Sequence, residues 1–420
     1  MRLDDRHRSR ERIHRETQTQ TDADTRETQT MMDQTESEQL RADVEAYCQE
    51  LRPIEDLCYL EHRYNSETIT LARKYDLLGM HISKEFGGRG SDLLTYMKAL
   101  ARIGREGTGV RTLFSGHSSI GQTPIADWGN TDQKQRYLRR SSRGDAILAF
   151  ALTEPEAGSN PREMQMTYRR DGDRFLLNGV KYLISNGGIA DAIITFACPE
   201  GGDRISAFIV DTDGPGIERE ELAAKLGLPP SHTAMFELVD YAVPIENILG
   251  EEGDGWRIAM ATLCSGRLSV AAGCLGVIED CLQEAADYAR QRVQHGKEIA
   301  RHQLVQEHIA LIEVGRQATE SLLYHAVSSK MASDDAPDDR EQRQRADLLS
   351  AEAKYFASNT ACDAADRAVQ VLGGRGYSEL YRPGRHWKDT RVCRIYEGTD
   401  EILKLKIAAG VLGKEFEAYS

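Results

Sequence analysis

The spacing of hydrophobic residues changes twice along the chain, and this change limits the possible folds more than any other feature. Before about residue 147 and after about residue 253, apolar residues recur every three or four positions, which is typical of amphipathic helices. Between these limits they form short runs rich in β-branched and aromatic residues, which is typical of strands. The order of helices, strands and helices argues against the alternating pattern of a doubly wound parallel sheet.

This order predicts an α+β protein whose helices and strands lie in separate domains. We expect three folded domains, namely an N-terminal all-α domain over 37–147, a middle antiparallel β domain over 148–252 and a C-terminal four-helix bundle over 253–420. Within them, Asp171-Gly172 predicts a tight hairpin, and Pro53 predicts a break or a start of a helix. Residues 1–36 contain no aromatic residue and few aliphatic ones, so we expect a disordered tail.

Composition excludes several classes of function. The chain has 53 Lys+Arg and 67 Asp+Glu, a net charge of −14, which argues against binding nucleic acid. No uninterrupted apolar run approaches the ~18–20 residues that span a bilayer, so no membrane partner is expected. The 8 cysteines are scattered without a CxxC pair, and no charged-then-apolar leader opens the chain. These features favour a cytoplasmic location.

Two segments of the strand region carry candidate binding groups. In the first, a strand leads into Thr153-Glu154-Pro155 and a loop with Gly158 and Ser159, whose N–H groups and hydroxyls could hold a polar ring edge or a phosphate. The second is a hairpin strand over 178–186 that ends in hydroxyl and amide side chains. Taken alone, each is equally consistent with an ordinary surface turn.

Glu397 is the candidate for acid–base chemistry. It follows apolar Ile395 and Tyr396 and precedes Gly398, and a carboxyl group beside an aromatic ring is a candidate base of raised pKa. The spacing alone fits a residue that merely favours a helix N-terminus. His295 and His302 lie seven positions apart without a carboxylate in ligand register, so no metal site is expected.

Taken together, these segments resemble the acyl-CoA dehydrogenase family of flavoproteins, from about residue 38 to the C-terminus. Six motifs carry the resemblance in order: ALTEPEAGSN (151–160), NGVKYLISNGGIAD (178–191), YARQRVQHGK (288–297), QLVQ (303–306), QVLGGRGY (370–377) and IYEGTDEI (395–402). The order of helices, strands and helices fits the family independently.

The resemblance implies FAD as cofactor and α,β-dehydrogenation of an acyl thioester such as an acyl-CoA. It implies that Glu397 removes the α-proton, that a hydride passes to flavin N5, and that the N–H of Glu397 helps to hold the thioester oxygen. Some family members carry the base on the long helix instead, at the position of Gly266 before Arg267. Glycine cannot be a base, so the resemblance favours Glu397.

The resemblance also implies a set of contacts with the ligands. The implied flavin contacts are Phe150, Leu152, Thr153, Leu183, Ser185, Arg292, His295, His302, Gln303, Gln370, Val371, Gly373, Gly374, Thr399 and Glu401. The implied substrate contacts are Ser159, Arg267 and Gly398, although Arg267 also fits a structural ion pair. Leu183 stands where an aromatic residue usually stacks on the flavin, and His295 stands where phenylalanine is typical.

Family resemblance implies shared flavin sites, and hence a homotetramer built as a dimer of dimers, with the segment around Gln370 lent by a neighbouring subunit. The electron acceptor is expected to be an electron-transfer flavoprotein or O2. Cys264 stands where some members place an acid that contacts the substrate's nucleotide, which raises the alternative of an acyl group tethered to a carrier protein. A flavin oxidase or monooxygenase, and a flavin-binding scaffold without catalysis, are further alternatives.

Overall fold

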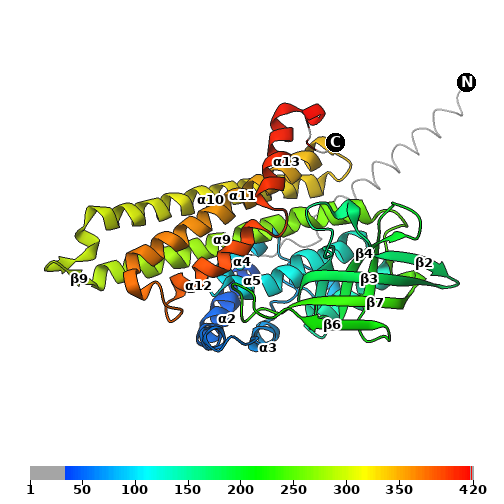
Figure 1. Ribbon diagram of the computed structural model, residues 1–420, viewed down its shortest axis with the longest axis horizontal. Helices are drawn as coiled ribbons and strands as arrows, with labels where there is room; N and C mark the ends of the chain where they lie inside the picture. The colour runs from blue at the N-terminus through cyan, green and yellow to red at the C-terminus, as the bar shows by residue number, and fades with distance from the viewer. Residues whose placement is uncertain (1–33, 417, 419–420) are drawn as a thin grey trace, which may run out of the picture.

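The computed structural model describes residues 34–416 and 418, and its elements follow the expected order of helices, strands and helices (Figure 1). Most of the tail that we expected to be disordered, residues 1–33, lies outside the described residues. The first described helix, α2 (Gln34–Leu60), begins before residue 37, so the last residues assigned to that tail are helical.

Short helices follow α2, and the π-helical segment among them contacts β1. They are α3 (Glu67–Lys74), α4 (Leu93–Gly104), α5 (Thr108–Phe114), α6 (Thr123–Trp128), α7 (Thr131–Gln133) and α8 (Arg139–Ser142), with π-helical turns at Ser115–Gln122 and Lys134–Leu138. Asp92 caps α4, because its side chain accepts a hydrogen bond from the N–H of Thr95 at 2.6 Å.

Pro53 lies inside α2 and does not end it, so the predicted break or helix start at this residue is wrong. Proline removes the hydrogen bond that its N–H would give to the carbonyl of Gln49. Both Pro53 and Gln49 are exposed, so water can bind that carbonyl. The apolar face on the other side of α2, which includes Leu40, Val44 and Leu51, stays buried and keeps the helix continuous.

The sheet has eight strands: β1 (Leu148–Ala151), β2 (Thr167–Asp171), β3 (Arg174–Ser185), β4 (Ala192–Pro199), β5 (Ser206–Asp211), β6 (Ile217–Glu221), β7 (Thr233–Pro244) and β8 (Ile248–Leu249). They lie in the order β6-β7-β3-β2-β4-β5-β8, with β1 beside β4. The β2–β3 hairpin confirms the predicted turn, with Gly172 at a φ of 66° and Asp171 paired with Arg174.

The middle domain is mainly antiparallel, as expected, and departs from this arrangement only at β4. Both β1 and β2 run parallel to β4, whereas the other pairings of this sheet are antiparallel. Tight turns join antiparallel neighbours such as β2 and β3, but parallel strands need a longer connection. The β2–β3 hairpin separates β1 from β4 along the chain, which gives the chain the length it needs to pair them in parallel.

Long helices form the C-terminal bundle. They are α9 (Gly255–Gln291), α10 (Gln303–Asp335) and α11 (Arg340–Leu372), followed by α12 (Arg382–Asp389) and α13 (Asp400–Leu412), and a small hairpin of β9 (Val293–Gln294) and β10 (Lys297–Glu298) joins α9 to α10. Among the described helices, α9 alone has the length and composition to cross a membrane. Its most apolar stretch is 89% buried inside the protein, so α9 is the core helix of the bundle.

Close contact between α4 and α9 connects the N-terminal helices to the bundle. A Cβ atom at Gly276 would lie 2.0 Å from the carbonyl oxygen of Ala101, and one at Gly104 would lie 2.7 Å from the carbonyl oxygen of Gly273. Only glycine permits backbones to approach so closely. This contact places α5, which follows α4, against the middle of α9.

Candidate active site

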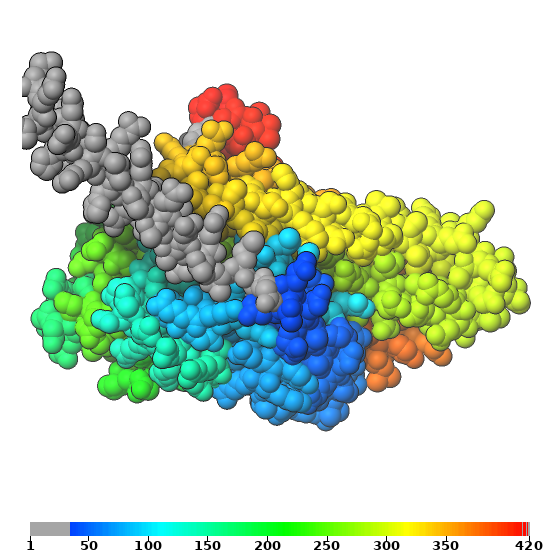
Figure 2. Space-filling view, turned by 180° about the vertical axis from the view of Figure 1, so that it is seen from behind, coloured from blue at the N-terminus to red at the C-terminus, as the bar shows by residue number. Residues whose placement is uncertain are grey.

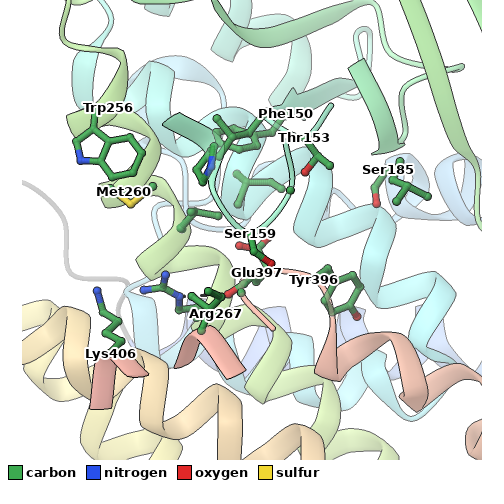
Figure 3. Close-up of a pocket in the computed structure, with 18 of the residues that line it drawn as sticks. Phe150, Thr153, Ser159, Ser185, Trp256, Met260, Arg267, Tyr396, Glu397 and Lys406 are labelled. Atoms are coloured by element: carbon green, nitrogen blue, oxygen red, sulfur yellow. Dashed lines mark hydrogen bonds between the residues drawn. The ribbon is translucent and has the colours of Figure 1, made fainter. Parts of the chain in front are cut away.

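A cavity of ≈ 360 Å³ lies between the carboxyl ends of β1 and β3, the first turns of α9 and the turn that leads into α13 (Figure 3). The residues implied by the resemblance that line it are Phe150, Leu152, Thr153, Ser159, Leu183, Ser185, Arg267, Glu397 and Gly398. These residues come from four separate segments, so the fold has brought together motifs that are far apart in the chain.

Glu397 reaches this cavity from a strained turn. Its φ is 54° and that of Gly398 is 96°, both in the left-handed region, which a residue with a side chain seldom adopts. Thr399 closes the turn by capping α13, because its hydroxyl accepts a hydrogen bond from the N–H of Ile402 at 3.3 Å. Lys354 of α11 holds the turn by donating a hydrogen bond to the carbonyl oxygen of Gly398 at 2.7 Å.

The carboxyl group of Glu397 has an unsatisfied oxygen. Its Oε2 atom is buried and has no hydrogen-bond partner among the described residues. Burial raises the pKa of Glu397 to about 7, although the nearby charges of Arg267, Lys354 and Arg111 act in the opposite direction. A carboxyl group with this pKa can take up and release a proton near neutral pH, which suits a general base.

Gly266 makes room for that carboxyl group. A Cβ atom at Gly266 would lie 2.5 Å from Oε2 of Glu397 and 2.7 Å from both its Cδ and Oε1. A side chain on α9 at this position and the present placement of Glu397 therefore exclude each other.

We predict that Gly266→Ala lowers the rate of substrate oxidation by about tenfold to a hundredfold, because the new methyl group must displace the Glu397 carboxyl group by an ångström or so. FAD content is expected to stay unchanged. Ser265→Ala, at the neighbouring position of α9, is the control, since no hydrogen bond of its hydroxyl is seen in the described structure. A full rate for Gly266→Ala in single-turnover kinetics would contradict this placement of Glu397.

Arg267 faces the cavity and also makes a hydrogen bond and an ion pair within the protein. Its Nε donates a hydrogen bond to the carbonyl oxygen of Glu397 at 3.3 Å, and its Nη1 lies 2.8 Å from Oδ1 of Asp347. Asp347 also binds Lys406, a further cavity residue. The ion-pair interpretation of Arg267 therefore agrees with the structure, and its contact with a substrate stays a prediction.

A buried ion pair supports the opposite wall. Nζ of Lys181 on β3 lies 2.8 Å from Oε1 of Glu154 and donates a second hydrogen bond to the carbonyl oxygen of Leu152 at 3.2 Å. Glu154 also accepts hydrogen bonds from the N–H groups of Gln165 and Met166. Glu154 is thus a structural residue that ties the loop after β1 to β3, which positions Thr153 and Ser185 at the cavity.

Leu183 lies at the cavity in an unusual conformation. Its φ is 60°, its side chain is 54% exposed, and the pairing of β3 with β7 shifts register between Lys181 and Ile184. Such a bulge turns a side chain out of the regular alternation of the strand. The bulge therefore presents an aliphatic side chain where the family resemblance leads us to expect an aromatic ring.

The other residues implied by the resemblance do not line this cavity. They are Arg292, His295, His302, Gln303, Gln370, Val371, Gly373, Gly374, Thr399 and Glu401. Arg292, His295 and Gln303 are exposed at the end of the bundle that projects away from the sheet, where the rings of His295 and His302 lie 6.2 Å apart (Figure 2). Gly373 and Gly374 are exposed at the end of α11.

Sequence reasoning missed several cavity residues. Trp256, Met260 and Leu263 line the cavity from α9 and continue the face that carries Arg267, with helical spacing. Ile402, Leu405 and Lys406 do the same on α13. The helical period was visible in the sequence, but the partner of each face was not.

Comparison with known proteins identifies the family. Models of the acyl-CoA dehydrogenase N-terminal, middle and C-terminal domains match residues 34–145, 149–241 and 253–412. An acyl-CoA dehydrogenase of Bacillus subtilis is 38% identical over 367 residues, which cover 87% of this chain and 94% of that protein. The chain belongs to the acyl-CoA dehydrogenase family.

Solved structures agree with this assignment. Butyryl-CoA dehydrogenase from Megasphaera elsdenii aligns with a TM-score of 0.84 and 32% identity, covering 91% of this chain and 100% of that one. An acyl-CoA dehydrogenase from Bacillus anthracis in complex with FAD aligns with a TM-score of 0.84 and 30% identity, covering 91% and 68%. The prolyl acyl carrier protein oxidase AnaB aligns with a TM-score of 0.83 and 27% identity, covering 91% and 100%.

The protein is therefore an oxidoreductase of the acyl-CoA dehydrogenase type with FAD as its cofactor. The residues present fit a flavin. Thr153 and Ser185 bring hydroxyl groups to the cavity, and a Cβ atom at Gly158 would meet no other atom within 4 Å, so the loop after β1 leaves space for a ligand. The unpaired Oε2 of Glu397 lines the same cavity.

Proposed function

We propose that this protein oxidises an acyl-CoA to its α,β-enoyl thioester, with Glu397 as the base that removes the α-proton. The observation that supports this most strongly is the unpaired, buried Oε2 of Glu397, whose pKa is raised to about 7 at the wall of a cavity. A carbon acid needs such a shielded base, because a carboxylate in water is too weak to remove its proton.

Bound FAD supplies the acceptor for the hydride that leaves the β-carbon. The chain supplies the remaining groups. The bond between the α-carbon and its proton breaks as Oε2 of Glu397 takes the proton, and the electron pair of that bond becomes part of the new double bond. The N–H of Glu397 donates to no other described residue, so it is free to hold the thioester oxygen and the negative charge that develops there.

We assign FAD contacts both to the implied residues that line the cavity and to those that lie outside it. Phe150, Leu152, Thr153, Leu183 and Ser185 surround the ring in the cavity. A second group, which lies outside the cavity, would hold the rest of the cofactor across a subunit contact: Arg292, His295, His302, Gln303, Gln370, Val371, Gly373 and Gly374. Thr399 and Glu401 would contact it from the start of α13. Ser159, Arg267 and Gly398 contact the thioester substrate.

Some of the assigned FAD contacts line the cavity, whereas others lie outside it at the end of the bundle. This separation supports assembly of the chain with copies of itself, because a second subunit could bring the two groups together. The bundle and its connecting segments also carry exposed apolar side chains, among them Leu304 of α10, Leu380 and Trp387. We therefore propose a homotetramer built as a dimer of dimers. All eight cysteines are free thiols, which supports the cytoplasmic location.

A second candidate reaction is the same oxidation of an acyl group tethered to a carrier protein, followed by transfer of the electrons to O2. Cys264 favours it, because this buried, uncharged residue stands where some family members place an acid that contacts the nucleotide of CoA. The structural similarity to the prolyl acyl carrier protein oxidase supports it as well.

One experiment tests the main proposal. The purified, FAD-loaded protein is mixed anaerobically with acyl-CoA and acyl-carrier thioesters, and the loss of flavin absorbance is followed. We expect acyl-CoA to bleach the flavin, and we expect the reduced flavin to react faster with an electron-transfer flavoprotein than with O2. Bleaching by carrier-bound substrates alone, or fast reoxidation by O2, would favour the second candidate.

The rate of bleaching is expected to rise with pH. Glu397 must be ionised to accept a proton, and its pKa is raised to about 7, so the ionised fraction falls about tenfold for each pH unit below that value. We therefore expect the apparent first-order rate to increase up to about pH 7 and to level off above it. Stopped-flow measurements across this range provide the test, and a rate that falls as pH rises through 7 would exclude an ionised Glu397 as the base.

A further inference from the structure

Lys354 of α11 is a buried cation, and no carboxylate among the described residues forms an ion pair with it. Within the described part of the chain, Lys181 and Lys354 are the two lysines with 0% exposure. Lys181 pairs with Glu154, whereas Lys354 donates a hydrogen bond to the carbonyl oxygen of Gly398 at 2.7 Å. A neutral side chain could donate that hydrogen bond without the cost of burying a charge. The hydrogen bond alone therefore does not explain a lysine at this position.

Helix α11 fixes the turn that carries Glu397 at two points. Lys354 holds the carbonyl group of Gly398. Asn359, just over one helical turn further along α11, donates a hydrogen bond to Oδ2 of Asp400 at 3.2 Å. Glu397 and Gly398 both have left-handed φ angles, so contacts from outside the turn are needed to keep this strained conformation.

Three cations act on the carboxyl group of Glu397. They are Arg267 of α9, Arg111 of α5 and Lys354 of α11, and each favours the ionised form, whereas burial favours the neutral form. Arg267 has an aspartate partner of its own, and Arg111 donates a hydrogen bond to the hydroxyl of Tyr396. Lys354 combines a charge that no carboxylate in the described structure neutralises with a direct contact to the backbone of the turn.

Other titratable groups also face Lys354. They are the thiols of Cys274 and Cys393 and the carboxyl group of Asp400. Asp400 already forms an ion pair with Arg394 at 2.7 Å. A hydrogen bond from Cys274 lowers the pKa of Cys393, so this thiol titrates closer to neutral pH than an ordinary cysteine and needs a control of its own.

Removal of the α-proton moves a negative charge within this turn. The charge is first on the carboxylate of Glu397 and then develops on the thioester oxygen, which the N–H of Glu397 is proposed to hold. Both positions belong to the residue next to Gly398, whose carbonyl group binds Lys354. In a buried site, a cation fixed beside the turn stabilises the negative charge in both positions and does not need to reorganise during the step.

We propose that Lys354 is a positioning residue for the oxidation, whose ammonium group fixes the turn of Glu397 and stabilises the negative charge that this turn holds before and after proton removal. The inference rests on the proposed function and adds no chemical step to it. It assigns to Lys354 a part of the pH dependence of the enzyme, which a lysine that only supports the fold would not have.

The test compares the pH profiles of FAD-loaded Lys354→Met and of the unaltered protein in single-turnover bleaching by the same acyl thioester. Loss of the cation makes ionisation of Glu397 harder, so we expect the midpoint of the profile to move from about pH 7 to about pH 8. The variant is then expected to lose about ten times more rate below pH 7 than above pH 9, since a shift of one unit changes the ionised fraction tenfold. A lysine that only supports the fold would cause the same loss at every pH.

Two further substitutions separate the charge from the hydrogen bond. Lys354→Gln removes the charge but keeps an N–H donor, and it is expected to shift the midpoint as Lys354→Met does. This variant also decides the question if Lys354→Met does not fold. Lys354→Arg keeps the charge, and its midpoint is expected to stay near that of the unaltered protein.

Matched controls test whether the shift belongs to Lys354. Lys181→Met removes the other lysine with 0% exposure, whose charge is paired with Glu154, and we expect its midpoint to stay in place whatever happens to its stability. Cys393→Ser removes the thiol near Lys354 and keeps a hydroxyl group beside Tyr396, and we expect no shift there either.

Each outcome has one interpretation. An unchanged midpoint in Lys354→Gln and in any folded Lys354→Met overturns the inference but leaves the proposed function intact. An equal shift in Lys354→Arg, Lys181→Met or Cys393→Ser also overturns it, because the shift would then not depend on the charge of Lys354. Failure of every thioester to bleach the unaltered protein overturns the proposed function itself, and that result is obtained before any variant is made.

Discussion

Replacing Glu397 with glutamine is expected to yield a folded protein that retains FAD but reduces it about 10²- to 10⁴-fold more slowly, or slower still. Glutamine has nearly the same shape as glutamate and can occupy the same left-handed turn between Tyr396 and Gly398. Its amide group cannot take up the α-proton. The loss is therefore expected in the chemical step, which single-turnover bleaching measures directly.

The protein offers a matched control for this variant. Glu55 is also a buried carboxyl group whose pKa burial raises to about 7, and it accepts a hydrogen bond from Asn65 at 2.7 Å, away from the cavity. Glu55→Gln makes the same chemical change and is expected to leave the bleaching rate unaltered. An unaltered rate for Glu397→Gln would refute its role as the base, and equal losses in both variants would indicate a general effect of removing a buried carboxyl group.

Lys181→Met is expected to lower the free energy of unfolding by about 3–5 kcal/mol, because it leaves the carboxylate of Glu154 buried without its cation. The side chains of Lys181 and Glu154 are 0% and 2% exposed, so water cannot replace the lost partner. Methionine has nearly the volume of lysine, which separates the loss of charge from the creation of a cavity. Denaturation by urea of the FAD-loaded protein measures the effect.

The double variant Lys181→Met/Glu154→Gln is the control for this prediction. It removes both charges and is expected to recover much of the lost stability, because the cost comes from the unpaired carboxylate rather than from the absent ion pair. Because the pair ties the loop after β1 to β3, we also expect the single variant to lose FAD at a lower urea concentration. A single variant as stable as the unaltered protein would show that the ion pair makes no net contribution.

Local patterns in the sequence were sufficient to predict the order of the helices and strands and to identify the motifs that meet at the cavity. The helical period predicted α9, α10 and α11, and the Asp171-Gly172 pair predicted the tight turn between β2 and β3. Pro53 was misjudged, because the tertiary burial of the apolar face of α2 outweighs a local preference.

Relations across the fold could not be predicted in this way. No local pattern indicates that the Glu397 carboxyl group lies against Gly266, because the two residues meet only when the turn before α13 rests on α9. Residues such as Arg292 and Gln370 lie outside the cavity of a single chain.

The mutual exclusion of a side chain at Gly266 and the carboxyl group of Glu397 limits how such an enzyme can evolve. A glutamate introduced at position 266 would collide with the existing one, and loss of the existing one first would leave no base. Either change made first therefore displaces or removes the existing base, so we expect a relocated base to require both changes together. We therefore expect the position of the base to stay the same in descendants of this protein even when their substrate preference changes.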